Sequence, residues 1–175
     1  KHPEVATSYN FLGHCYHEQS DYDKAIEYFN QSISIRIMAL GPEHSDVAVS
    51  YNNLGMLYSS MGEIDKAISF YEQSLSIRMK IFDPEHTEIA AIYNNLGQTY
   101  CDKGNYDKAI EYYQRSLAIF LKPPHTEGAE VATIYNNLGT VFHYKGDNDK
   151  AIGYFERSLA IERRMLGPDH PEVAT

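Results

Sequence analysis

Residues 47–88 read VAVSYNNLGMLYSSMGEIDKAISFYEQSLSIRMKIFDPEHTE, and this stretch decides the fold because the chain contains it in four related copies. The copies align without a gap at 5–46, 47–88, 89–130 and 131–172, a period of 42 residues. A period of this length indicates a repeat architecture in which each unit stacks on its neighbours. Residues 1–4 match the end of a copy and 173–175 match a beginning, so we expect an excerpt from a longer array.

Eleven positions of the repeat hold one residue type in all four copies, and their spacing predicts two helices per copy. In the first helix, Tyr51, Leu54 and Tyr58 are spaced i, i+3 and i+7, which places them on one helical face. In the second copy this helix is predicted over about 45–61. Gly62 follows, and a glycine ends a helix readily because it adopts the left-handed conformation. In the first copy Ser20 holds this position, where the same conformation has a cost.

The second helix of each copy is predicted to begin after a capping residue and to end near repeat position 36. Asp21, Asn105 and Asp147 are suitable N-caps, and Glu63 is a weaker one. Three copies then contain residues that stop a helix, namely Gly41-Pro42, Asp83-Pro84 and Gly167-Pro168. In the third copy Pro123-Pro124 falls two positions early and Gly128 replaces a histidine, so we expect that loop to be reshaped.

Composition excludes several broad classes of protein. The chain has 15 Lys and Arg against 24 Asp and Glu, a formal charge of −9, and no basic stripe for binding nucleic acid. Its longest uninterrupted apolar run, 117–121, is too short to span a membrane. Cys15 and Cys101 occupy non-equivalent positions two copies apart, so both are predicted to be free thiols. A cytoplasmic protein without nucleic-acid or membrane partners is therefore expected.

Leu54-Gly55, Tyr58, Ala67 and Tyr71, with the matching residues of the other copies, resemble the tetratricopeptide repeat (TPR) in its 42-residue, kinesin light chain-like form. The resemblance covers the whole chain. It implies an all-α fold, a right-handed α-solenoid of helix-turn-helix repeats, with residues 1–175 forming a single array. It also implies a non-enzymatic scaffold that binds a partner protein or peptide in its concave groove, as a kinesin light chain-like cargo adaptor does.

Six positions of the first helix, numbered 3, 6, 7, 10, 13 and 14 from the start of each copy, point away from the core. In TPR arrays this side lines the concave groove, and we call it the candidate groove face. The candidate peptide-binding residues are the amides at positions 6 and 7 and the variable residues at positions 10 and 13. They are Asn10, Asn52, Asn53, Asn94, Asn95, Asn136, Asn137, His14, Met56, Gln98, Thr140, His17, Ser59, Cys101 and His143.

The repeated asparagines can have either of two roles. Their amides suit pairing with the backbone of an extended peptide, and they equally suit bonds between neighbouring helices. Variation at positions 10 and 13 would then set specificity. None of the six positions holds Lys or Arg, so a clamp for an acidic peptide is not supported. Four arginines on the second helices are expected to be solvated or paired on the outer surface, although they are long enough to reach a ligand; they are Arg36, Arg78, Arg115 and Arg157.

No catalytic residue, cofactor or metal site is predicted. The chain lacks the G-x-S-x-G, H-E-x-x-H and G-x-x-x-x-G-K motifs. His14, His17, Cys101 and His143 do not repeat the tight spacing of a structural zinc site, although protonation of the histidines would tune binding. The recurrent loop histidines are expected to act at the start of the following helix; they are His44, His86 and His170.

A structural spacer or self-associating array is the alternative function. After the fourth copy, Ile152, Phe155 and Leu159 would have little cover, which favours end-to-end self-association.

Overall fold

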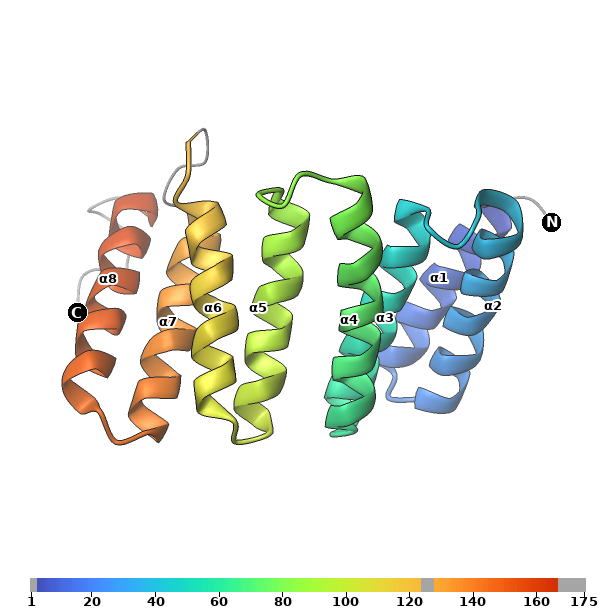
Figure 1. Ribbon diagram of the computed structural model, residues 1–175. Coiled ribbons are helices and arrows are strands. Elements are labelled where there is room, and N and C mark those ends of the chain that lie inside the picture. The colour runs from blue at the N-terminus through green and yellow to red at the C-terminus, as the bar shows by residue number, and fades with distance from the viewer. Residues whose placement is uncertain (1–2, 124–127, 167–175) are drawn as a thin grey trace. The chain divides into compact units, whose positions relative to one another are not determined.

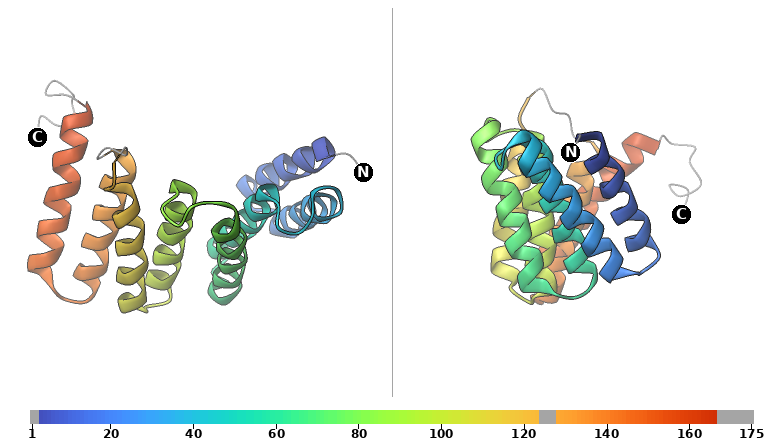
Figure 2. Two further views of the ribbon diagram at one scale, coloured as in Figure 1. Left: turned by 45° about the horizontal axis from the view of Figure 1, so that its top comes forward. Right: turned by 90° about the vertical axis from the view of Figure 1, so that its right-hand side faces the viewer.

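The computed structural model describes residues 3–123 and 128–166, and within these ranges every regular element is an α-helix (Figure 1). The chain divides into two compact units, 1–84 and 85–175. Unit 1 contains α1 (Pro3–Glu18), α2 (Tyr22–Leu40), α3 (Ser45–Ser60) and α4 (Ile64–Ile81). Unit 2 contains α5 (Thr87–Asp102), α6 (Tyr106–Phe120), α7 (Ala129–Tyr144) and α8 (Asn148–Leu166). Consecutive helices form the pairs α1/α2, α3/α4, α5/α6 and α7/α8, visible in Figures 1 and 2.

The first helix of each pair ends as the sequence predicts. α3 spans Ser45–Ser60, against a prediction of about 45–61. The residue two positions after each first helix has a left-handed backbone, with φ between 76° and 80° at Gly62, Gly104 and Gly146. Ser20 takes the same conformation at φ 60°, which costs a residue with a side chain about 1–2 kcal/mol. The turn geometry is therefore common to all four copies, and the first copy adopts it at a cost.

The second helices begin at the predicted caps. The side chains of Asp21, Asn105 and Asp147 each accept a hydrogen bond from a backbone N–H three residues on, whereas Glu63 makes no such bond. α6 ends at Phe120, four residues before the repeat position at which α2 ends, as expected for the loop with early prolines. Part of that loop, the Gly167-Pro168 stop and the fifth start at 173–175 lie outside the described residues.

In each pair, a glycine of the first helix packs directly against an aromatic ring of the second helix. A Cβ added at Gly97 would lie 2.7 Å from both Cδ1 and Cε1 of Tyr113, a fully buried side chain. Any larger residue would therefore have to displace that ring. The same contact occurs in the other three pairs, where Gly13 meets Phe29, Gly55 meets Tyr71 and Gly139 meets Phe155.

A buried hydrogen bond also joins the two helices of each pair. In α6, Ser116 Oγ donates to the carbonyl oxygen of Ala90 in α5 at 2.8 Å. The bond is directional, so it fixes how the two helices are aligned along their axes as well as how closely they approach. The equivalent bonds run from Ser32 to Ala6, from Ser74 to Ala48 and from Ser158 to Ala132.

Aromatic rings stack beside this contact in every pair. Tyr112 of α6 lies between Tyr93 and Tyr100 of α5, with centroid distances of 6.0 and 5.4 Å. Lys108 Nζ lies 4.8 Å from the Tyr100 ring centroid, a cation–π distance. The tyrosines therefore serve packing. The equivalent close stacks are Tyr16 with Tyr28, Tyr58 with Phe70 and Phe142 with Tyr154.

Within each unit the two pairs also pack together. In unit 1, Ala25, Phe29 and Ile33 of α2 form a buried cluster with Leu54 and Leu57 of α3. In unit 2, α6 packs on α7. Among the described residues, none of the helices combines the length and the apolar character that crossing a membrane requires.

Candidate groove face

Most of the predicted groove residues reach the surface. Twelve of the fifteen are exposed or half-buried, whereas Asn10, Asn53 and Cys101 are buried and present little surface to a ligand. Burial raises the pKa of the Cys101 thiol, and the charge of Asp102 raises it further. Neither thiol is in a disulfide, as predicted, and Cys15 is exposed.

Four of the asparagines pair between neighbouring first helices. In unit 1, Asn53 Nδ2 donates to Asn10 Oδ1 at 2.9 Å, and in unit 2 Asn137 Nδ2 donates to Asn94 Oδ1 at 3.1 Å. These bonds support the reading in which the amides join helices. Each bond uses one acceptor site and one N–H, so the pair in unit 2, which is only part-buried, keeps donors and acceptors for a ligand.

The candidate groove face of unit 1 is further tied together by its histidines. His17 Nε2 lies 2.8 Å from Ser60 Oγ, which links α1 to α3. His14 meets the ring of Phe29 edge-on, with centroids 5.2 Å apart. Burial lowers the pKa of His14, and the charge of His17 lowers it further against a smaller opposite effect of Glu18. His14 is therefore neutral around pH 7.

In unit 2 the variable positions bond mainly to their own helix. Gln98 Nε2 donates to Asp102 Oδ1 at 2.8 Å, and Gln98 Oε1 accepts from the Tyr113 hydroxyl at 3.2 Å. Thr140 Oγ1 donates to the carbonyl of Asn136 at 3.1 Å. A ligand that approached these side chains would have to compete with these bonds or add to them.

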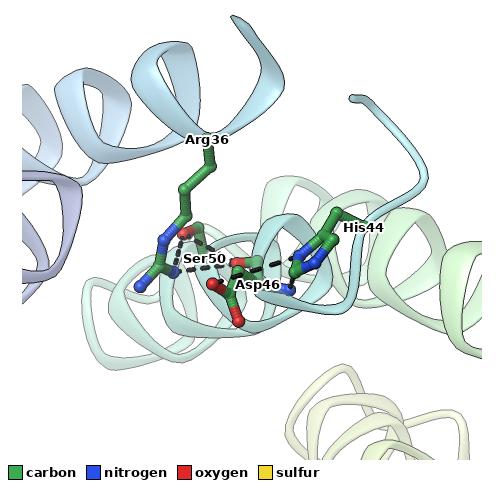
Figure 3. A network of polar contacts seen from close by, with 4 residues as sticks. All are labelled: Arg36, His44, Asp46 and Ser50. Carbon is green, nitrogen blue, oxygen red and sulfur yellow. Dashed lines mark hydrogen bonds and ion pairs between the residues drawn. The ribbon is translucent and has the colours of Figure 1, made fainter. Parts of the chain in front are cut away.

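The structure corrects the expectation for two of the arginines. Arg36 and Arg78 are only 6% exposed, so they do not lie on a solvated outer surface. Figure 3 shows Arg36 turned toward α3, where its Nη1 donates to the Asp46 carbonyl at 2.8 Å and to Ser50 Oγ at 2.6 Å. Burial lowers the pKa of Arg36, and Asp46 partly offsets that effect. The buried guanidinium is thus held by the first turns of the next helix.

The other two arginines lie on the surface, as predicted. Arg115 Nη2 lies 2.6 Å from Glu111 Oε1, and its guanidinium lies over the rings of Tyr93 and Tyr112. Arg157 lies over the equivalent rings of the last pair.

Two of the recurrent histidines cap helices. His44 Nδ1 accepts from the backbone N–H of Asp46, and His86 Nδ1 accepts from that of Glu88, both at 3.2 Å. This confirms their predicted place at the start of α3 and α5, while His170 lies outside the described residues. In the described part of the chain, no three His, Cys, Asp or Glu side chains are grouped to hold a metal ion.

Unit 2 contains a pocket at the candidate groove face, and it involves residues that the sequence does not single out. The pocket has a volume of about 180 Å³ and lies where α5, α6 and α7 meet. Its lining residues are Ala91, Asn94, Asn95, Phe120, Glu130, Thr133 and Ile134. Only the two asparagines belong to the predicted set. The departure of the third copy, with its early prolines, is the signal in the sequence that this region differs from the others.

Comparison with known proteins adds the family. The sequence model for the tetratricopeptide repeat matches residues 4–80, 46–122 and 130–175. No curated protein matches the chain. Among solved structures, BtubC (BKLC) from P. vanneervenii is 28% identical, has a TM-score of 0.85, and the match covers 98% of this chain and 68% of that one.

A second solved structure is a kinesin light chain-like protein of Podospora anserina with nearly identical TPR-like repeats. It is 24% identical with a TM-score of 0.82, over 99% of this chain and 82% of the other. These likenesses confirm the predicted all-α solenoid class of helix-turn-helix repeats. The family match extends over nearly the whole sequence, and the chain therefore belongs to the tetratricopeptide repeat family.

Proposed function

We propose that this chain is a non-enzymatic scaffold that binds an extended segment of a partner protein on its candidate groove face. TPR proteins are interaction scaffolds, which supports the general part of the proposal. The observation that carries the specific part is the pocket in unit 2, because it opens beside Asn94 and Asn95 on the predicted side of α5. A pocket next to side-chain amides suits a peptide, since its side chain enters the pocket while its backbone pairs with the amides.

The chemistry of the amides supports this mode of binding. Asn94 Oδ1 already accepts from Asn137, which fixes the orientation of the Asn94 amide, and Asn94 Nδ2 keeps its two N–H groups for a peptide carbonyl. A side chain held in place by a neighbouring helix loses less conformational entropy when it binds than a mobile one does. An amide that joins two helices can therefore bind a peptide as well, through the donors that the bond between helices does not use.

The narrower form of the proposal is a kinesin light chain-like cargo adaptor that acts in the cytoplasm. The likeness to a kinesin light chain-like structure supports the first part. The low cysteine content supports the second, because two cysteines are too few for the disulfide framework typical of small secreted domains.

A peptide-display selection tests the groove. The parent chain is compared with a triple variant, Asn52→Ala with Asn94→Ala and Asn136→Ala. A control triple removes amides from the second helices instead, with Asn30→Ala, Gln73→Ala and Gln114→Ala. We expect an enriched peptide motif on the parent and on the control but not on the groove variant. Thermal unfolding of the groove variant must match that of the parent; if that variant melts early, the amides are structural, and the groove proposal loses its support.

The exposed apolar side chains of α8 favour a second candidate function, a self-associating array or spacer. Phe155 is 37% exposed, whereas Phe29 at the same repeat position is fully buried under α3. Ile152 and Leu159 are exposed beside it. Light scattering over a range of concentrations tests this candidate. If the molar mass still rises with concentration after a polar capping helix is fused behind the last repeat, self-assembly is supported. If the rise disappears, the association comes from the exposed apolar side chains of α8.

A further inference from the structure

The same three repeat positions are filled differently in the two units. In unit 1 they are Arg36, Asp46 and Ser50, and the Arg36 guanidinium is bonded to the other two (Figure 3). The equivalent residues of unit 2 lie 84 positions further on, in the third and fourth copies.

 Two periods of 42 residues separate each equivalent pair, so the three residues of unit 2 are Phe120, Glu130 and Ile134.

The guanidinium therefore has no counterpart at this place in unit 2. Phe120, Glu130 and Ile134 line the pocket of about 180 Å³ described above. At this repeat position unit 1 has the Arg36 side chain bonded to α3, whereas unit 2 has Phe120, which forms one wall of an open pocket.

The walls of the pocket have the chemistry that a long cationic side chain needs. Ala91, Phe120 and the buried Ile134 supply apolar surface for an aliphatic stem. Glu130 supplies an exposed carboxylate at the rim, and among the described residues this carboxylate forms no hydrogen bond or ion pair. Arginine and lysine pack their stems on apolar surface while their charged heads stay at a polar rim.

We propose that this pocket receives an arginine side chain from the partner's peptide, whose guanidinium donates to Glu130 as that of Arg36 donates to the equivalent Asp46 in unit 1. The inference rests on the proposed function and names the chemistry of its ligand. The Arg36 head donates to the carbonyl of Asp46, and Glu130 has a carbonyl at the equivalent position together with its carboxylate. A guanidinium has donors for both groups at once, whereas the single ammonium of lysine is a point charge. An acidic side chain would be repelled by Glu130.

The backbone of the same peptide would lie along Asn94. This residue also lines the pocket, and its Nδ2 group keeps donors for a peptide carbonyl. The pocket would thus select one side chain of the peptide, and the Asn94 amide would bind the peptide backbone irrespective of the other side chains. The formal charge of −9 favours approach of a basic segment.

Nuclear magnetic resonance titration of the full chain tests the inference with two defined probes, acetyl-Ala-Arg-Ala-amide and acetyl-Ala-Gln-Ala-amide. We expect the arginine probe to shift the backbone amide signals of Ala91, Glu130 and Thr133, and to bind at least about threefold more tightly than the glutamine probe. Equal binding of the two probes, no shifts, or shifts confined to other residues would overturn it.

Two charge-neutralising variants separate the pocket from general electrostatics. Glu130→Gln is expected to weaken the arginine probe roughly fivefold, while Glu156→Gln, which removes one charge from the exposed surface of α8, leaves its binding unchanged. Equal effects of the two variants would show that only net charge matters. Both changes are at exposed positions, so the fold is not at risk.

A third variant fills the pocket from within. Phe120→Arg with Ile134→Ser rebuilds the arrangement of unit 1, and we expect it to abolish the shifts caused by the arginine probe.

The display selection distinguishes the inference from the proposed function. Enriched peptides that require Asn94 but neither arginine nor Glu130 would overturn the inference and support the groove. A selection without any enriched peptide would remove support from the groove, and the probe titration would still test the pocket.

Discussion

The contact between Gly97 and Tyr113 predicts that adding one methyl group destabilises the protein at one glycine and stabilises it at another. Gly97→Ala places a Cβ 2.7 Å from two carbons of the buried Tyr113 ring. Gly153 lies in the middle of α8, and a Cβ there would have no atom within 4 Å. The two substitutions are chemically identical, and both occur inside a helix, so only the packing differs.

The expected magnitudes follow from two opposing effects. Replacing glycine by alanine in a helix interior favours folding by about 1 kcal/mol, and this gain applies at both sites. Overpacking of a well-filled core costs about 1–3 kcal/mol, and this cost applies only at Gly97. We therefore expect Gly97→Ala to lower the free energy of unfolding by about 1 kcal/mol and Gly153→Ala to raise it by about the same amount.

Urea unfolding followed by far-ultraviolet circular dichroism measures both changes against the parent. The slope of the free energy with urea should stay the same in all three proteins, since the surface exposed on unfolding is unchanged. A Gly97→Ala protein at least as stable as the parent would refute the packing argument. The larger change Gly97→Leu is expected to unfold the pair, and Ala109→Leu, at a fully buried position, is expected to do the same.

Three further predictions concern single side chains. Ser116→Ala should lower the free energy of unfolding by about 1 kcal/mol because it removes a buried hydrogen bond, while Ser34→Ala, at an exposed site, should leave urea unfolding unchanged. Ser20→Gly should raise the thermal midpoint, since it relieves a left-handed backbone at φ 60°; a lower midpoint would contradict this. Burial raises the pKa of Cys101, so its thiol stays protonated at pH 8, and a disulfide reagent should react fast with exposed Cys15 and slowly with Cys101 until the chain is unfolded.

The repeat made the helices predictable. Capping by Asp21 and Asn105 and the left-handed glycines depend on residues that lie near one another in sequence. The early end of α6 at Phe120 followed from the prolines after it. Aligning the four copies shows which residues recur at the starts and ends of the helices, and these recurring residues predict where each helix begins and ends.

Contacts between helices were harder to predict. A helical projection places Cys101 on the open side of α5, but it takes no account of what packs beside that side, and the structure buries the thiol. Arg36 appeared as a surface residue because arginine usually is one, while its partners Asp46 and Ser50 lie on the following helix, α3. The hydroxyl of Ser116 had a recognisable signal, an invariant polar residue on an apolar face, but its acceptor is a backbone carbonyl that no sequence pattern marks.

The stacked tyrosines give the protein an optical reporter in each unit. The chain contains no tryptophan, so its near-ultraviolet absorption is dominated by tyrosine. Tyr16 and Tyr28 stack at 5.3 Å in unit 1, and Tyr100 and Tyr112 stack at 5.4 Å in unit 2. Rings this close and nearly parallel couple their electronic transitions, which produces a circular dichroism signal that vanishes when the rings separate. Tyr28→Phe would reduce the circular dichroism signal of unit 1 and leave that of unit 2. The difference between the melting curves of the parent and the variant would then follow unit 1 without an attached dye.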